Sequence, residues 1–154
     1  MSSRQRGRLA LWLLAGAALG GTACALAQAG AGLQPPARSC PAADEVTHLH
    51  LYGLWLARFD GLPGTATLWL EKSPSHAEGV SGSIERADQR ALVAGDVDEG
   101  DFTLEESSDG QRIAATWIGK VSEDACGMEI QGTWTRAEDN TSYPFVLRKQ
   151  PGWR

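Results

Sequence analysis

Four side chains have the chemistry to bind a small molecule: Trp55, Phe59, Trp134 and Glu106. Aromatic ring faces bind apolar groups and cations, and a carboxylate adds one polar contact. We therefore expect a binding site for a small apolar or cationic ligand, with the three rings as its walls and Glu106 as its polar contact. The alternative is a plain core, in which the same rings fill the interior.

Two clusters have residue types that bind metal ions. His48 and His50 alternate, as ligands on one face of a strand do. Further ligands could come only from a few nearby residues: Asp44, Glu45 and His76. The run 96–101 is rich in carboxylates, but its order of Gly and Asp does not match an EF-hand. We expect a solvated histidine pair and an acidic turn, with no metal and no cofactor.

Catalytic signatures are absent from the sequence. It has no Gly-x-Ser-x-Gly elbow and no His-Glu-x-x-His motif. Glu105 and Glu106 are adjacent, so on a strand they point to opposite faces and cannot act as an acid–base pair. The sequence predicts a protein that is not an enzyme and has no catalytic residues.

The three cysteines fall into two groups. Cys24 lies in the N-terminal apolar segment, whereas Cys40 and Cys126 lie outside it. Two cysteines in an oxidising compartment most simply pair with each other. We expect a disulfide between Cys40 and Cys126.

The N-terminal residues have the pattern of an export signal. Three arginines precede an uncharged run from Leu9 to Ala27, and two small-x-small cleavage motifs end at Ala27 and Ala29. We expect a signal peptide over residues 1–29, an Ala/Gly/Pro-rich linker over 30–45 and a folded domain over 46–150. An uncleaved anchor and a lipoprotein modified at Cys24 are the alternatives. Each places the domain outside the cytoplasmic membrane, in the periplasm or secreted.

The net charge excludes some partners. Without the three leader arginines, 11 basic and 19 acidic residues give a net charge of −8. Nucleic acid is excluded as a partner, and the membrane is contacted only through the N-terminal segment. A basic envelope protein remains a possible partner.

Period-two alternation of apolar residues begins after the linker and continues to the end of the chain. It predicts eight strands, over residues 48–59, 65–72, 79–87, 91–98, 101–107, 112–120, 127–136 and 143–149. The breaks carry glycine-containing turns such as Asp98-Glu99-Gly100. Short links join antiparallel neighbours, so we predict an all-β, single-domain, up-and-down barrel of eight strands.

The more apolar phase of each strand predicts the inward residues. They are Leu49, Leu51, Gly53, Trp55, Ala57, Phe59, Ala66, Leu68, Leu70, Val80, Gly82, Ile84, Val93, Gly95, Val97, Phe102, Leu104, Ile113, Ala115, Trp117, Gly119, Met128, Ile130, Gly132, Trp134, Phe145 and Leu147. If the first strand runs upward, both cysteines of the expected disulfide lie at the lower end. The same topology places Trp55, Phe59, Trp134 and Glu106 at the upper end.

Two Gly-x-Trp motifs, Gly53-Leu54-Trp55 and Gly132-Thr133-Trp134, lie in the first and seventh predicted strands. On these residues the chain resembles the calycin group of barrels, which includes lipocalins and avidin-like proteins. The resemblance covers about 100 residues and implies an eight-stranded ligand-binding barrel. The chain lacks room for the helix that follows the last strand in lipocalins. Its one asparagine, Asn140, is far from the first turn, where avidin-like proteins hold biotin.

The sequence thus favours a non-enzymatic, exported barrel that binds a small ligand at its upper end. The alternative is a loop-mediated inhibitor or interaction module for a periplasmic hydrolase such as lysozyme, whose basic surface would suit an acidic partner. Of the loop motifs of such inhibitors, the chain has only a generic Ser81-Gly82.

Overall fold

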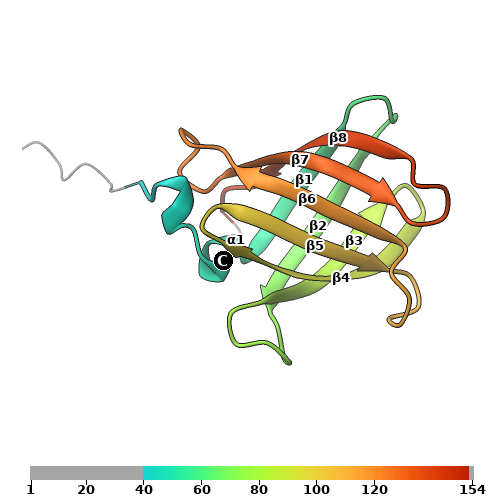
Figure 1. The fold of residues 1–154 in the computed structure, drawn as a ribbon, viewed down its shortest axis with the longest axis horizontal. Coiled ribbons are helices and arrows are strands. Elements are labelled where there is room, and N and C mark those ends of the chain that lie inside the picture. The colour runs from blue at the N-terminus through green and yellow to red at the C-terminus, as the bar shows by residue number, and fades with distance from the viewer. Residues whose placement is uncertain (1–39, 153–154) are drawn as a thin grey trace, which may run out of the picture. The chain divides into compact units, whose positions relative to one another are not determined.

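The computed structural model of the chain describes residues 40–152 (Figure 1). Two short helical turns, η1 (Ala43–Glu45) and α1 (His48–Leu51), precede the strands. Eight strands follow: β1 (Gly53–Phe59), β2 (Thr65–Lys72), β3 (Val80–Arg86), β4 (Gln89–Asp98), β5 (Asp101–Ser107), β6 (Ala115–Val121), β7 (Glu129–Arg136) and β8 (Ser142–Lys149). The predicted all-β class and the number of strands are confirmed.

The eight strands form one closed up-and-down barrel. Each strand pairs antiparallel with the next, and β1 pairs with β8 to close the sheet. The turn between β4 and β5 contains Glu99 and Gly100, whose φ angles are 46° and 83°. Both angles are positive, as a tight two-residue hairpin turn requires. Ser81 and Gly82 lie within β3 and therefore form no loop motif.

The predicted strand starts are wrong at three places. Leu49, predicted to point inward, is 63% exposed because His48–Leu51 form a helical turn. Ile113 and Met128 are 47% and 39% exposed because β6 and β7 begin only at Ala115 and Glu129. In each case the alternation of apolar residues in the sequence extends N-terminally beyond the first residue that pairs in the sheet.

The interior is filled by the inward side chains of all eight strands. The fully buried large side chains include Trp55, Leu68, Ile84, Phe102, Trp117, Ile130 and Leu147. All were predicted to point inward. Leu51, which was predicted to be an inward residue of the first strand, is also fully buried but lies on the α1 turn. Burial of every second side chain removes apolar surface from water, and this determines which face of each strand points into the barrel.

Glycine occupies inward positions where neighbouring strands come close. A Cβ on Gly132 would lie 2.1 Å from the backbone oxygen of Ile118, and one on Gly82 would lie 1.8 Å from that of Trp69. No side chain fits at such a distance. These glycines therefore permit the strong coiling that closes a narrow barrel.

A disulfide fastens the N-terminal segment to the barrel. Cys40 and Cys126 are joined at an S–S distance of 2.01 Å across 86 residues of sequence. Cys126 lies in the β6–β7 link, at the same end of the barrel as η1 and α1 (Figure 1). The predicted pairing, and its placement at the end where β1 begins, are confirmed.

The folded part includes residues assigned to the linker by sequence. Ala43 in η1 is buried and belongs to the core, as does Val46. The expected signal peptide, its cleavage sites and Cys24 lie outside the described residues. Within residues 40–152, no helix has the length and apolar character needed to cross a membrane.

Candidate functional site

The barrel has two different ends, which we call the closed end and the open end. At the closed end, the N-terminal turns cover the barrel and bury Ala43, Val46 and Leu51. The indole Nε1 of Trp55 donates a hydrogen bond to the Leu51 carbonyl oxygen at 2.7 Å. Lys149 Nζ lies 5.7 Å from the Trp55 ring centroid and donates to the carbonyl oxygen of His50. Desolvation at this place lowers the pKa of Lys149.

Trp55 is therefore not at the open end, where the sequence predicted it. It is the third residue of β1 and fully buried. The prediction placed it further along because the first strand was expected to begin at residue 48. The real strand begins at Gly53, so its early residues lie next to the closed end.

Beneath the open end lies a layer of aromatic rings formed by Phe59, Trp117, Trp134 and Phe145. The Trp117 centroid lies 5.3 Å from that of Phe59, 6.5 Å from that of Trp134 and 4.8 Å from that of Phe145. The rings are tilted or edge-to-face, the arrangements that aromatic pairs prefer. Phe59 and Trp134 are 9% and 3% exposed, so these two predicted wall residues are part of the core.

Arg86 covers this aromatic layer. Its guanidinium carbon lies 4.5 Å from the Trp134 ring centroid and 5.0 Å from that of Phe59. Its Nη2 lies 3.5 Å from Glu106 Oε2, which also accepts a hydrogen bond from Trp134 Nε1 at 3.1 Å. Arg86, Glu106 and Trp134, which we call the polar cap, therefore hold one another at the open end through ion pairing, hydrogen bonding and cation–π contact.

Sequence reasoning missed Arg86, although the signal was present. It follows Val80, Gly82 and Ile84 in the inward phase of the third strand, so its side chain had to point into the barrel. Glu106 follows Phe102 and Leu104 in the same way on β5. Arg86 ends β3 and Glu106 lies near the end of β5, and both strands run toward the same end of the barrel. Two inward side chains of opposite charge at one end predict an ion pair there.

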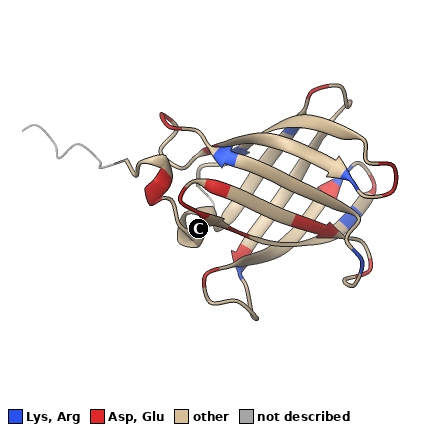
Figure 2. Cartoon of the chain, viewed as in Figure 1, with Lys and Arg blue, Asp and Glu red and all other residues tan. Residues whose placement is uncertain are grey.

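Above the polar cap the barrel opens into a hollow of about 1040 Å³. Its lining includes Glu106 and Trp134 among the predicted residues, and small side chains from three segments, Ala91, Ala115 and Ala137. Four arginines also line it: Arg86, Arg90, Arg112 and Arg136. Basic and acidic residues follow one another along the ribbon at this end, where the β5–β6 and β7–β8 links lie (Figure 2).

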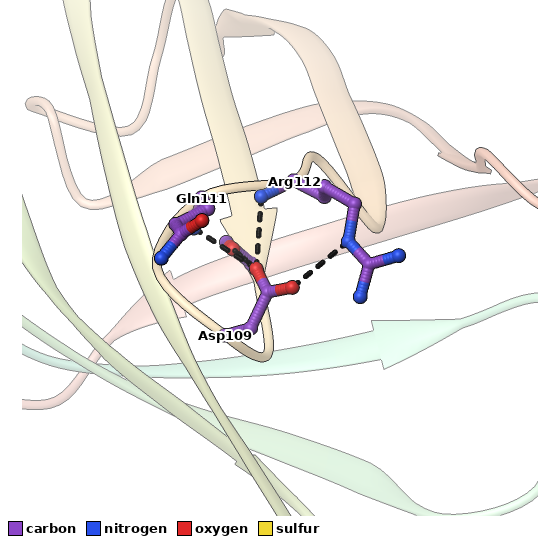
Figure 3. A network of polar contacts seen from close by, with 4 residues as sticks. Asp109, Gln111 and Arg112 are labelled. Atoms are coloured by element: carbon purple, nitrogen blue, oxygen red, sulfur yellow. Dashed lines mark hydrogen bonds and ion pairs between the residues drawn. The ribbon is translucent and has the colours of Figure 1, made fainter.

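The β5–β6 link is fixed by Asp109, as Figure 3 shows. Its Oδ1 accepts backbone N–H bonds from Arg112 at 2.8 Å and Gln111 at 2.9 Å, and its Oδ2 accepts from Arg112 Nε at 2.9 Å. These bonds, first the backbone N–H of Arg112, hold the pKa of Asp109 well below its usual range. Arg112 is thereby held beside the hollow.

The β7–β8 link is built in the same way around Asp139. Its Oδ1 accepts the backbone N–H of Thr141 at 3.0 Å, and its Oδ2 lies 3.3 Å from Arg136 Nη1. The bond from Thr141 lowers the pKa of Asp139, and the charge of Arg136 acts in the same direction. Arg136 also lies 5.8 Å from the Trp134 ring centroid.

The histidines do not share one face as the sequence suggested. They lie on the α1 turn, where His50 Nδ1 accepts the Thr47 backbone N–H at 3.0 Å and the His48 ring lies 6.0 Å from that of Tyr52. Within residues 40–152, no group of three or more His, Cys, Asp or Glu side chains is arranged to hold a metal ion.

The structure thus brings Phe59, Glu106 and Trp134 together at the open end and leaves Trp55 at the closed end. Comparison with known proteins adds no assignment: the sequence matches no protein-family model and no curated protein.

Proposed function

We propose that this chain is an exported, non-enzymatic binding protein of the calycin type, which takes a small molecule in the hollow at the open end of its barrel. The observation that carries the proposal is the difference between the two ends. The closed end is sealed by Ala43, Val46 and Leu51. The open end holds a hollow of about 1040 Å³, at the upper limit of the usual size of small-molecule pockets.

The calycin assignment is supported by the barrel and by two motifs. Gly53-Leu54-Trp55 begins β1, and Gly132-Thr133-Trp134 lies in β7. A closed, eight-stranded, up-and-down barrel is the architecture of that group.

The proposed ligand lies outside the aromatic layer. Because Arg86 covers Phe59 and Trp134, a ligand in the hollow meets the polar cap first, and Trp134 is the ring of the aromatic layer that lines the hollow. Phe59 then supports the site from below, and Glu106 fixes Arg86. Trp55 has a separate role in the closed end.

Export is proposed from the N-terminal sequence, with its three arginines, its apolar run and its small-x-small cleavage motifs. The Cys40–Cys126 disulfide is consistent with an oxidising compartment such as the periplasm.

Native mass spectrometry on the full chain, purified from the envelope of its own host without refolding, tests both parts. A mass added to the polypeptide and lost on denaturation supports ligand binding. A bare polypeptide contradicts it and favours the search for a protein partner, such as a lysozyme-type hydrolase. A polypeptide short of about 27 or 29 residues supports cleavage at one of the two motifs. The full-length mass contradicts cleavage.

Two matched variants locate the ligand. Ala137 is exposed and lines the hollow, so Ala137→Trp fills part of it. Ala94 is exposed on β4 and does not line the hollow, so Ala94→Trp adds the same bulk elsewhere. We expect the added mass to vanish in Ala137→Trp and to persist in Ala94→Trp. Persistence in both places the ligand outside the hollow.

A further inference from the structure

We propose that the hollow at the open end selects an organic anion, with an oxyanion group held by Arg112 and Arg136 beside Arg86 and with an apolar part against Leu62 and Ile113. The inference rests on the proposed function, since it names the chemical class of the ligand for the same hollow.

The first argument is the concentration of positive charge. The described residues contain nine of the 14 basic side chains and all 19 acidic ones, so their net charge is 9 − 19 = −10. Six of those nine are arginines, and four of the six line the hollow. The acids that line it are Glu106, Asp109 and Glu138, which leaves a local balance of 4 − 3 = +1. Four of the six arginines in residues 40–152 therefore lie around one depression of an acidic domain.

The second argument is a surplus of hydrogen-bond donors. Glu106 Oε2 accepts from both Arg86 and Trp134, and both oxygens of Asp109 accept hydrogen bonds. These carboxylates are thus already engaged. Each guanidinium has five N–H donors, and Arg112 and Arg136 each use one side-chain nitrogen on a carboxylate. The buried Nε of Arg86 has no hydrogen-bond partner among residues 40–152. An oxyanion supplies the acceptors that these donors lack.

The third argument is that the arginines are held in position. Arg86 and Arg136 end the inward phases of β3 and β7, so their side chains are directed over the barrel interior. Arg112 Nε lies 2.9 Å from Asp109 and Arg136 Nη1 lies 3.3 Å from Asp139, and the Arg112 side chain is otherwise 90% exposed. Guanidinium groups ordered before binding lose less side-chain entropy when an anion arrives.

The lining also accommodates an apolar part. Leu62 is partly buried against the core, and Ile113 is 47% exposed. The lining also includes four alanines, Ala91, Ala114, Ala115 and Ala137, whose small side chains leave space open. A ring or short aliphatic group fits this mixture, whereas a bare inorganic ion would leave the apolar lining without contact.

Two other ligand classes are disfavoured by the same observations. A cation would meet four arginines in the lining, and two of its three carboxylates, Glu106 and Asp109, already accept hydrogen bonds from the protein. An anionic membrane surface would be repelled by the net charge of −10 over the described residues.

Two dyes with one ring system test the inference. Anilinonaphthalene sulfonate carries an oxyanion, and phenylnaphthylamine is the same aromatic amine without it. Fluorescence titration of the full chain gives the affinity for each dye, and Ala137→Trp with Ala94→Trp as its control shows whether the dye lies in the hollow. We expect the sulfonate to bind about tenfold more tightly or better, as one or two charge-assisted hydrogen bonds imply. Raising the salt concentration should weaken the sulfonate alone.

Charge variants give an independent reading. Arg112→Gln combined with Arg136→Gln should lower the affinity for the sulfonate about tenfold and leave phenylnaphthylamine within about twofold. Arg58→Gln is the control, because Arg58 is exposed on the outer face of β1 and does not line the hollow. Equal affinities for the two dyes in the hollow would overturn the anion preference and leave the proposed function intact. Absence of either dye from the hollow would overturn both.

Discussion

Removal of the Glu106 carboxylate tests whether the polar cap holds the open end together. Glu106 is the common partner of Arg86 and Trp134. Glu106→Ala leaves the guanidinium without its carboxylate and the Trp134 indole N–H without its acceptor. Glu106→Gln keeps an oxygen for Trp134 and removes only the charge. Glu105→Ala is the control, because Glu105 is exposed on the opposite face of β5.

The size of the effect follows from burial and distance. The side chains of Arg86 and Glu106 are 23% and 12% exposed, so the pair lies between a surface salt bridge, worth about 0–1 kcal/mol, and a buried one, whose breakage costs about 3–5 kcal/mol. The Arg86–Glu106 distance of 3.5 Å is long and that of Trp134–Glu106 is 3.1 Å. We expect Glu106→Ala to lower the free energy of unfolding by about 2–3 kcal/mol and Glu106→Gln by about 1 kcal/mol. Glu105→Ala should stay within about 0.5 kcal/mol of the parent.

Urea unfolding with the disulfide intact, followed by tryptophan fluorescence, measures these differences. A double-mutant cycle of Glu106→Gln with Arg86→Met isolates the ion pair and should give a coupling of about 1 kcal/mol. A cost for Glu106→Ala no larger than that for Glu105→Ala, together with zero coupling, would refute the reasoning. The open end would then be held by the aromatic layer alone.

Three further predictions concern the rest of the barrel. Reduction of the Cys40–Cys126 disulfide should lower stability by about 4.6 kcal/mol in the chain-entropy treatment of an 86-residue separation, and an unchanged thermal melt would contradict this. Trp117→Ala should cost about 3–5 kcal/mol in urea unfolding, since the ring is fully buried. Trp117→Phe should cost less than half as much, because its buried Nε1 has no hydrogen-bond partner among residues 40–152, and an equal cost would show that this N–H matters. The folded-state pKa of Asp109, Asp139 and Glu129 is lowered by hydrogen bonds. The stability they contribute is therefore complete above the ordinary carboxyl pKa and is lost as the pH falls from there through the lower folded-state pKa. Unfolding free energy should decline below about pH 4, less steeply in Asp109→Asn, and an identical slope in that variant would contradict the assignment.

The candidate site was only partly predictable. Phe59, Trp134 and Glu106 were correctly placed at one end because strand direction and inward phase determine it. Arg86 was missed because the inward phase was chosen by apolar content, and a charged residue at its end was given no weight. Trp55 was misplaced because nothing in the alternation of residues 48–55 marks the change from helical turn to strand.

The sequence by itself determined the class, the number of strands, their inward phases and the disulfide, because these depend on local alternation, turn chemistry and cysteine count. Only the tertiary structure decided which end of the barrel is sealed and which stays open. That outcome depends on contacts between residues far apart in the chain, such as Lys149 with His50 and Arg86 with Glu106 and Trp134. Such contacts form only when the barrel closes, which brings the ends of β3, β5 and β7 together and places the end of β8 beside the α1 turn.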